Sequence, residues 1–197
     1  MAYPTVSAPY GFKPVNRIDG MPYAGATRLV TIASGYATNL FYGDLVTLVT
    51  GGTIEKFTGT TSGAMIGVFL GCQYTDPSTK QPRNAQYWPS GTIASDAQAV
   101  VVDDPMAQFQ VAVTDAGSVV VSSTTIAARG ANVSVIQGAG NTNTGDSGQS
   151  ILAGSEGTAA TLPIRVIDVV PATITATGYP ELLVKLNTHQ YNNTTGV

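Results

Sequence analysis

The sequence has few charged residues, one cysteine and no long apolar run. Aspartate, glutamate, lysine and arginine make up 11% of the 197 residues, against about 25% in a typical soluble domain. Hydrophobic residues make up 43%, which is enough to fill a sizeable core. The polar surface therefore consists mainly of uncharged side chains, and so weak a charge field does little to prevent self-association.

These shortages exclude several classes of function. Nine basic residues, scattered along the chain, and twelve acidic ones give a net charge of −3, so we expect no nucleic-acid partner, which would need a basic face. No apolar run reaches the roughly 20 residues of a membrane span, and we expect no membrane partner. The single Cys72 excludes an internal disulfide and a cysteine-based metal cluster. The first residues show no basic segment followed by an apolar one, which predicts no secretory signal.

Residues 1–26 form a segment in which prolines alternate with aromatic residues. Proline removes a backbone donor and biases the preceding residue towards extended backbone. We therefore expect an extended arm, not a helix or a central strand, lying either on its own domain or on a neighbouring molecule. The residues expected to bind a partner are Pro9, Tyr10, Phe12, Pro14 and Tyr23. Removal of residues 2–25 is expected to leave a folded domain.

From residue 27 onward, short β-branched runs alternate with turn residues at intervals of about 10 residues. This pattern predicts an all-β, β-rich domain over residues 27–197 with a β-sandwich or β-barrel core. Gly51-Gly52 is expected to form a two-residue hairpin turn. At most one short helix is expected, at Thr124–Arg129, capped by Ser122 or Ser123 and ended by Gly130. The expected strands are 27–32, 45–50, 53–57, 66–74, 84–88, 98–102, 109–113, 133–136, 162–169 and 182–187.

The glycine-rich stretch at residues 138–148 is predicted to be a long exposed loop. Its Gly145-Asp146-Ser147-Gly148 matches the sequence around the nucleophile of chymotrypsin-like serine proteases. That chemistry needs a histidine base, but the only histidine, His189, follows the serine, whereas in those enzymes the histidine precedes it. Asn141-x-Asn143-x-Gly145-Asp146 lacks the several carboxylates of a calcium loop. We expect neither a protease site nor a calcium site here.

Two further candidates for chemistry are interpreted as structural. Cys72 lies in an apolar, strand-like run, which favours a buried thiol over a reactive pair with His189. Asp103 and Asp104 precede Pro105, which favours a turn over a pair of catalytic carboxylates. The sequence thus predicts no catalytic, cofactor-binding or metal-binding residues, and a protein that is not an enzyme.

A series of short motifs runs through nearly the whole chain in the order typical of one family. Together they resemble the capsid decoration (cement) proteins of tailed bacteriophages. Each motif is short, and their order carries the resemblance. The motifs are Ser7-Ala-Pro-Tyr-Gly-Phe-Lys-Pro-Val15, Gly20-Met-Pro-Tyr-Ala-Gly25, Ala33-Ser34, Tyr42-Gly-Asp-Leu-Val46, Gly67-Val-Phe-Leu-Gly71, Tyr87-Trp-Pro89, Val101-Val-Asp-Asp-Pro105 with Phe109, Leu162-Pro-Ile-Arg-Val166 and Val184-Lys-Leu-Asn-Thr-His-Gln190.

The resemblance implies a structural virion protein on the outer surface of an icosahedral phage head. There it would bind the major capsid protein, stabilise contacts between its subunits and form a homotrimer, without a cofactor. A carbohydrate-binding or host-attachment module on the virion surface is the alternative. That alternative predicts an exposed aromatic platform with Tyr87 and Trp88 as first candidates, whereas core packing at a strand end is the simpler interpretation of this pair.

Overall fold

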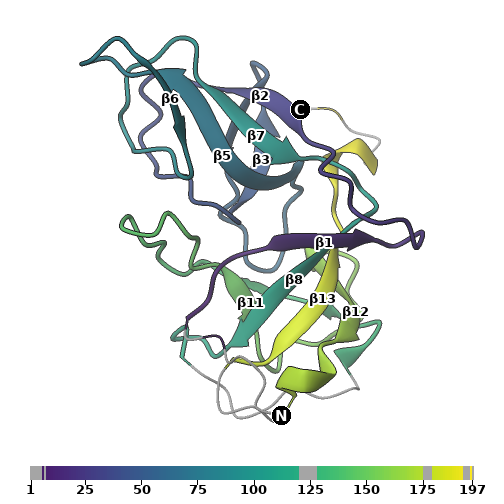
Figure 1. Cartoon of the computed structure of the whole chain (residues 1–197). Helices are drawn as coiled ribbons and strands as arrows, with labels where there is room; N and C mark the ends of the chain where they lie inside the picture. Colours follow the sequence, from purple (N-terminus) through teal and green to yellow (C-terminus); the bar gives the residue numbers. More distant parts are fainter. Residues whose placement is uncertain (1–5, 7, 120–127, 175–178, 193–195, 197) are drawn as a thin grey trace.

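The fold is built from β-strands arranged in two curved sheets (Figure 1). It is given by a computed structural model that describes residues 6, 8–119, 128–174, 179–192 and 196. Within these residues there is no α-helix, and the complete helical elements are two 3₁₀ turns, η2 (Pro171–Thr173) and η3 (Gln190–Asn192). The all-β architecture predicted from the sequence is confirmed. The short helix expected at Thr124–Arg129 falls mostly outside the described residues.

The first barrel is the six-stranded sheet, formed by consecutive strands of the chain. The strand order is β3-β4-β2-β7-β5-β6, and the sheet closes on itself because β3 pairs with both β4 and β5. β6 lies outside this ring and pairs with β5 alone. The strands are β2 (Arg28–Ile32), β3 (Leu45–Val49), β4 (Thr53–Lys56), β5 (Gly67–Thr75), β6 (Pro82–Ala85) and β7 (Gln98–Val102).

The first barrel follows its sequence pattern closely. All its strands except β6 lie within a residue of the expected ranges. Alternate residues such as Ala99 and Val101 of β7 are fully buried, as a strand with one face in a core requires. The strand expected at 84–88 lies earlier in the chain, since β6 ends at Ala85. The fully buried Trp88 forms an isolated bridge with Leu40 instead.

Gly51 and Gly52 lie in the turn between β3 and β4, at the predicted place. The turn spans residues 50–52 and is one residue longer than expected, because Val49 pairs with Thr53. Both glycines have positive φ, +112° and +77°, a conformation that costs other residues energy. A Cβ on either would meet nothing within 4 Å, so backbone conformation alone accounts for glycine here.

The second barrel is the seven-stranded sheet, which comes mostly from the C-terminal half of the chain. The strand order along its main path is β10-β11-β8-β13-β12-β9. Its two ends, β9 and β10, are separated in the chain only by Ser134, so the sheet nearly closes into a barrel. The strands are β8 (Ala107–Thr114), β9 (Asn132–Val133), β10 (Val135–Ile136), β11 (Ser150–Leu152), β12 (Ile164–Val169) and β13 (Glu181–Leu186).

The remaining strand of the second barrel comes from the arm. β1 (Lys13–Arg17) pairs antiparallel with β8, with a shift of register between Pro14 and Asn16. In Figure 1 this strand, in dark purple, lies across β8 and β13 where the two barrels adjoin. Within the described part of the chain β1 pairs with β8 alone, which fits the expectation that a proline-rich arm avoids a central position.

Each barrel has its own core, and the two cores differ in origin. The core of the first barrel contains Phe69 and Trp88 and comes from the strands and loops of that barrel alone. The core of the second contains Phe109 of β8, Phe12 of the arm, and residues such as Leu45 of the first barrel. The second core is therefore shared by three parts of the chain.

Candidate functional site

The arm and the first barrel touch backbone to backbone where Gly11 crosses Gly43. The N–H of Phe12 donates to the carbonyl of Gly43 at 2.9 Å. Both glycines have positive φ, +76° and +88°. A Cβ on Gly11 would lie 2.5 Å from the Gly43 oxygen, and one on Gly43 would lie 2.8 Å from the Tyr10 oxygen. Only glycine at both positions allows the two backbones to approach this closely.

Two of the five residues expected to bind a partner are buried inside the protein's own fold. Phe12 is fully buried and packs edge-to-face on Phe109, with ring centroids 6.5 Å apart. Tyr10 is 8% exposed, and its hydroxyl donates to the carboxylate of Glu181 at the start of β13. Burial and this carboxylate raise the pKa of Tyr10 well above its usual value. In this position the arm offers neither side chain to a partner.

The other three arm residues are half-buried: Pro9, Pro14 and Tyr23. Tyr23 packs partly against the second core. The arm is thus an integral part of the second barrel. We therefore expect removal of residues 2–25 to disrupt this barrel, and not to leave the whole domain folded. Their removal would open the second core at Phe109 and leave Glu181 without its tyrosine donor.

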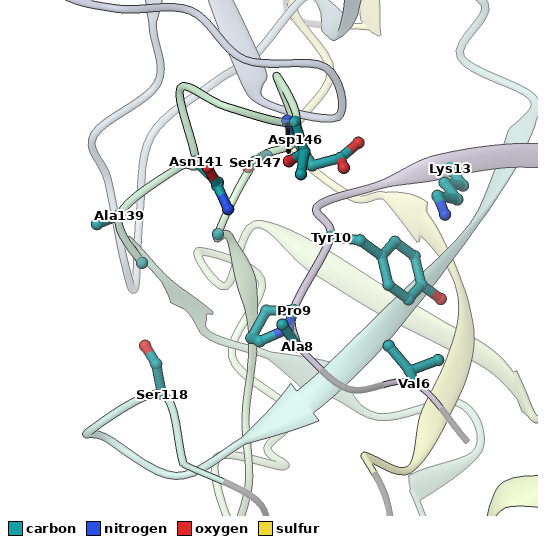
Figure 2. A pocket seen from close by; sticks show the side chains of 13 residues that line it. Val6, Ala8, Pro9, Tyr10, Lys13, Ser118, Ala139, Asn141, Asp146 and Ser147 are labelled. Atoms are coloured by element: carbon teal, nitrogen blue, oxygen red, sulfur yellow. Dashed lines mark hydrogen bonds between the residues drawn. The ribbon is translucent and has the colours of Figure 1, made fainter.

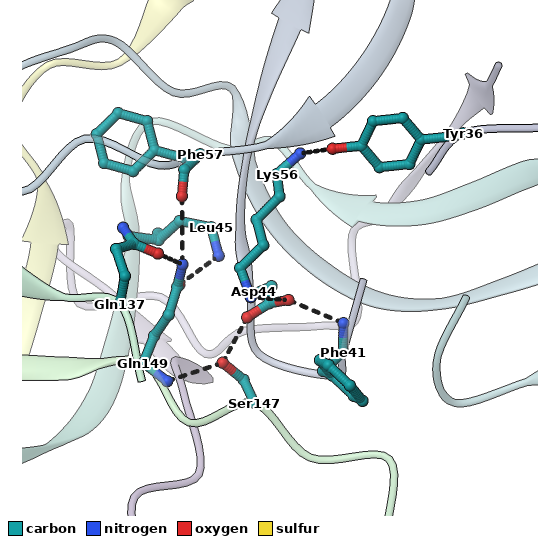
Figure 3. A network of polar contacts seen from close by, with 9 residues as sticks. All are labelled: Tyr36, Phe41, Asp44, Leu45, Lys56, Phe57, Gln137, Ser147 and Gln149. Atoms are coloured by element: carbon teal, nitrogen blue, oxygen red, sulfur yellow. Dashed lines mark hydrogen bonds and ion pairs between the residues drawn. The ribbon is translucent and has the colours of Figure 1, made fainter. Parts of the chain in front are cut away.

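A buried ion pair lies beside the glycine crossing, at the junction of the two barrels (Figure 3). Asp44 is fully buried, and its Oδ2 lies 3.0 Å from Nζ of Lys56 and accepts the N–H of Phe41 at 2.9 Å. Its Oδ1 accepts the hydroxyl of Ser147 at 2.6 Å. Ser147 belongs to the loop before β11, so the contact joins the two barrels. A buried carboxylate needs this many donors to offset its lost hydration.

Two glutamine side chains extend this junction network, as Figure 3 also shows. Gln149 accepts the N–H of Leu45 at 2.8 Å, and its amide nitrogen donates to Gln137 at 2.7 Å. Gln137 in turn donates to the carbonyl of Gly59 at 2.9 Å. The side chains of the second barrel thus complete backbone hydrogen bonding of the first. Such a network fixes the relative position of the two barrels because every member constrains the next.

Ser147 of the protease-like motif and the single histidine, His189, have separate partners. The Ser147 hydroxyl donates to Asp44 and accepts the N–H of Gln149 at 3.0 Å. His189 lies in the C-terminal tail, where its Nδ1 accepts the N–H of Tyr191 at 3.1 Å. Ser147 therefore acts as a buried structural hydroxyl in this arrangement. Sequence alone does not identify Asp44 and Lys56 as a buried pair, because a strand-end aspartate and lysine are ordinary surface residues in most chains.

The glycine-rich stretch is only partly the exposed loop that was expected. Residues 141–144 are exposed, but Gly145 and Ser147 to Ser150 are buried. The carbonyl of Gly145 accepts the N–H of Tyr42 at 2.9 Å, and the N–H of Ser147 donates back to the Tyr42 carbonyl at 2.9 Å. The prediction of a fully exposed loop was wrong because these backbone bonds dock the segment on the first barrel.

A cavity of about 620 Å³ lies between this loop and the arm (Figure 2). Pro9, Tyr10 and Lys13 line one side, and Asn141 and Asp146 line the other. The polar groups at its rim are largely engaged by the protein itself. Asp146 accepts the amide of Gln86 at 3.1 Å, and the Lys13 ammonium lies 4.1 Å from the centroid of the Tyr10 ring. Among the described residues no group of three or more His, Cys, Asp or Glu side chains could hold a metal ion.

The burial expected for Cys72 and the turn expected after the aspartate pair are both found. Cys72 is 3% exposed on β5, and burial raises the pKa of its thiol to about 12. Asp104 lies in a turn and accepts the N–H of Met106 at 2.8 Å. Asp103 and Asp104 bind different partners, Arg28 at 2.7 Å and Arg17 at 3.3 Å respectively, so they do not form a carboxylate pair.

The aromatic pair at residues 87 and 88 divides between core and surface. Trp88 is fully buried and lies 5.3 Å from the Tyr74 ring in an edge-to-face contact. Tyr87 is half-buried and stacks on Phe41 with ring centroids 5.5 Å apart. Trp88 is therefore a core residue, as the simpler interpretation held, and a platform made by both rings is not formed.

An exposed apolar patch on the outer side of the arm was not predicted. We call Val15, Met21 and Met106 the arm patch; these side chains are 41%, 59% and 38% exposed. Backbone bonds hold the segments together: Arg17 N–H donates to Met21 and Ile18 N–H donates to Met106, at 3.1 and 2.9 Å. Sequence alone does not reveal it, because Met106 follows β7 and lies far from the arm in the chain.

Comparison with known proteins adds no further constraint. No protein-family model, curated protein or solved structure matches this chain. In the parts of the chain that the structure describes, none of the helical segments has the length and apolar character to cross a bilayer. The candidate functional surface therefore rests on the structure alone. It consists of the arm, the arm patch and the junction that holds them.

Proposed function

We propose that this protein is a capsid decoration protein of a tailed bacteriophage. It binds the outer surface of the icosahedral head and stabilises contacts between major capsid protein subunits, without catalysing a reaction. It acts as a homotrimer. The proposal is supported by the ordered motifs that resemble this family and by a surface with few charges, which suits a protein that works inside a larger assembly.

The observation that carries the proposal furthest is the arm patch. Val15, Met21 and Met106 are exposed, and backbone bonds from the arm residues Arg17 and Ile18 join the segments that carry the two methionines. Exposed apolar surface on joined segments is a common mark of a protein-binding site. The arm patch rests on β1 and on the turn before β8, both anchored to the second barrel. It is therefore a preformed surface, which costs little entropy when it binds.

This assigns the shell contact to the outer side of the arm. Pro14 and Tyr23, which are half-buried, flank the patch in sequence and remain candidates for the same contact. Tyr10 and Phe12 instead hold the arm to its own barrel. A single patch of this size supports only weak binding, but many identical contacts on one shell add by multivalency.

The test is co-sedimentation of the purified protein with cognate capsid shells, before and after expansion. We expect saturable binding to expanded shells at a fixed ratio to the major capsid protein. Met21→Asp should reduce that binding at least tenfold, because it places a charge in an apolar contact (about 1.4 kcal/mol for each factor of ten). Ile93→Asp is the matched control, since Ile93 is 67% exposed on the first barrel.

Two results would contradict this assignment. If neither shell binds the protein, the decoration role fails, and a glycan-binding screen would then test the host-attachment alternative. If Met21→Asp and Ile93→Asp bind shells as the unaltered chain does, the role survives but the arm patch is the wrong surface.

A further inference from the structure

The chain has one histidine, and it is fully buried. His189 lies in residues 187–192, the segment that returns from β13 to the first barrel; we call it the clamp. Its Nδ1 accepts the N–H of Tyr191, which leaves the proton on Nε2. Among the described residues Nε2 has no hydrogen-bond partner. A buried imidazole in this state is uncharged, although the backbone carbonyls of Ile66 and Asp103 face the ring.

The clamp binds the first barrel by its backbone on both sides of His189. The N–H of Met65 donates to Thr188 at 3.1 Å, and the N–H of Gln190 donates to Met65 at 2.8 Å. The side-chain amide of Gln190 pairs with Leu48 of β3, accepting its N–H and donating to its carbonyl, both at 2.8 Å. These bonds tie the end of β13, a central strand of the second barrel, to β3 of the first.

The charged groups near His189 lie on other elements and are themselves paired. Asp103, after β7, accepts the hydroxyl of Tyr191 at 3.0 Å and pairs with Arg28 of β2 at 2.7 Å. Asp104 pairs with Arg17 of β1 at 3.3 Å. The two carboxylates and the backbone carbonyls of Ile66 and Asp103 favour a protonated imidazole, and burial opposes it. Burial is the larger effect, and the pKa of His189 is lowered from its usual value.

We propose that His189 makes the clamp an acid-sensitive lock between the two barrels. Protonation requires a charged imidazolium in a site from which water is excluded, so the clamp detaches from Met65 and Leu48 to hydrate the ring. The barrels keep their own cores and hydrogen bonds. Acidification thus loosens the contact of the C-terminal tail with the first barrel, while the strands of the second barrel stay protected.

The direction of the pH dependence follows from proton linkage. The ring binds a proton less readily in the closed clamp than in the open one, where its pKa is about 6.5. Above that pH both states are uncharged and the clamp is unaffected. As the pH falls below about 6.5, the open state gains a proton, and the ratio of open to closed clamp rises by up to about tenfold for each pH unit until the closed-state pKa is reached.

The unaltered protein provides the first test, because one histidine gives one set of ring signals. We would follow them by NMR from pH 8 to pH 4.5 in protein labelled at histidine. The proposal expects a midpoint below about 6.5, with clamp amide shifts that follow the same curve. A midpoint at or above that value overturns it.

Hydrogen exchange, corrected for the intrinsic effect of pH, tests the lock itself. Between pH 7.5 and 5.5 exchange should rise, by up to about tenfold, in the clamp and at Met65, and stay unchanged in β8 and β12. His189→Gln should abolish the pH-dependent part. Tyr191→Phe is the matched control: it loses the bond to Asp103 but keeps the histidine, so the pH response should remain. An equal response in His189→Gln and the unaltered chain overturns the proposal.

Discussion

The two barrels are assembled by different routes, and only the first sheet closes fully by strand pairing. Residues 28–102 supply every strand of the first barrel, and its core is made by its own strands and loops. The second barrel takes a strand from the arm, closes through β9 and β10 on either side of Ser134, and borrows core residues such as Leu45 and Met65. The first barrel is a local structure, whereas the second is completed by distant parts of the chain.

This difference decides where the molecule is vulnerable. A barrel built from consecutive strands loses little when a distant segment is removed. The second barrel depends on the Phe12–Phe109 contact, the Tyr10–Glu181 bond and the Asp44–Ser147 bond, each of which joins residues more than 95 positions apart. The functional surface assigned above, the arm patch, rests on this dependent part.

The largest effect is expected from removal of residues 2–17. The second core then loses Phe12, and β8 loses its partner β1. Truncation of one buried phenylalanine costs about 3–5 kcal/mol, and removal of the arm should exceed that. Hydrogen exchange should show β8 and β13 unprotected while β5 and β7 stay protected. Equal loss in both barrels would show that they fold as one unit, and no loss in either would show that the arm is dispensable.

The junction network tests whether the two barrels depend on each other for stability. Asp44→Ala leaves the Lys56 ammonium in a site where it is only 13% exposed, without its counter-ion. Breaking a buried ion pair on one side costs about 3–5 kcal/mol. We expect the free energy of unfolding, measured with urea, to fall by that amount. The unfolding of each barrel should shift to lower urea concentration, because the network belongs to both barrels.

The double variant Asp44→Ala/Lys56→Met is the control for the unpaired charge. It should recover part of the stability, since replacing both charges removes the uncompensated ammonium. A double variant no more stable than Asp44→Ala would mean that the unpaired Lys56 ammonium is not the cause of the lost stability.

Sequence patterns predicted the strands of the first barrel, which come from one stretch of the chain, better than those of the second. β7 was predicted to the residue from its β-branched run, and Gly51-Gly52 located the hairpin turn. In the second barrel β11 went unpredicted, because the short segment Ser150–Leu152 has too little alternation to read as a strand. β1 was expected as an extended arm, and nothing in its prolines and aromatic residues indicated that β8 would receive it.

The candidate site shows the same limit. Pro9, Tyr10, Phe12, Pro14 and Tyr23 were singled out by their composition as residues that bind a partner. Composition does not distinguish a partner's surface from the chain's own second core, and the structure buries Tyr10 and Phe12 in the latter. The arm patch and Asp44 depend on contacts between distant segments, which a single sequence does not record.

The smallest change, a single methyl group, tests whether the arm and first barrel must touch backbone to backbone. Gly43→Ala and Gly52→Ala both place alanine at positive φ, +88° and +77°, so both incur about 1 kcal/mol of backbone strain. At Gly43 the new Cβ also lies 2.8 Å from the Tyr10 oxygen, whereas at Gly52 it meets nothing within 4 Å. We expect Gly43→Ala to cost about 1–2 kcal/mol more than Gly52→Ala, measured by urea unfolding.

The added loss should appear as faster hydrogen exchange at Phe12 and in β1, since the methyl group pushes the arm away from Gly43. Equal losses in the two variants would mean that the arm can shift aside without cost, and that the second barrel is held by its core alone.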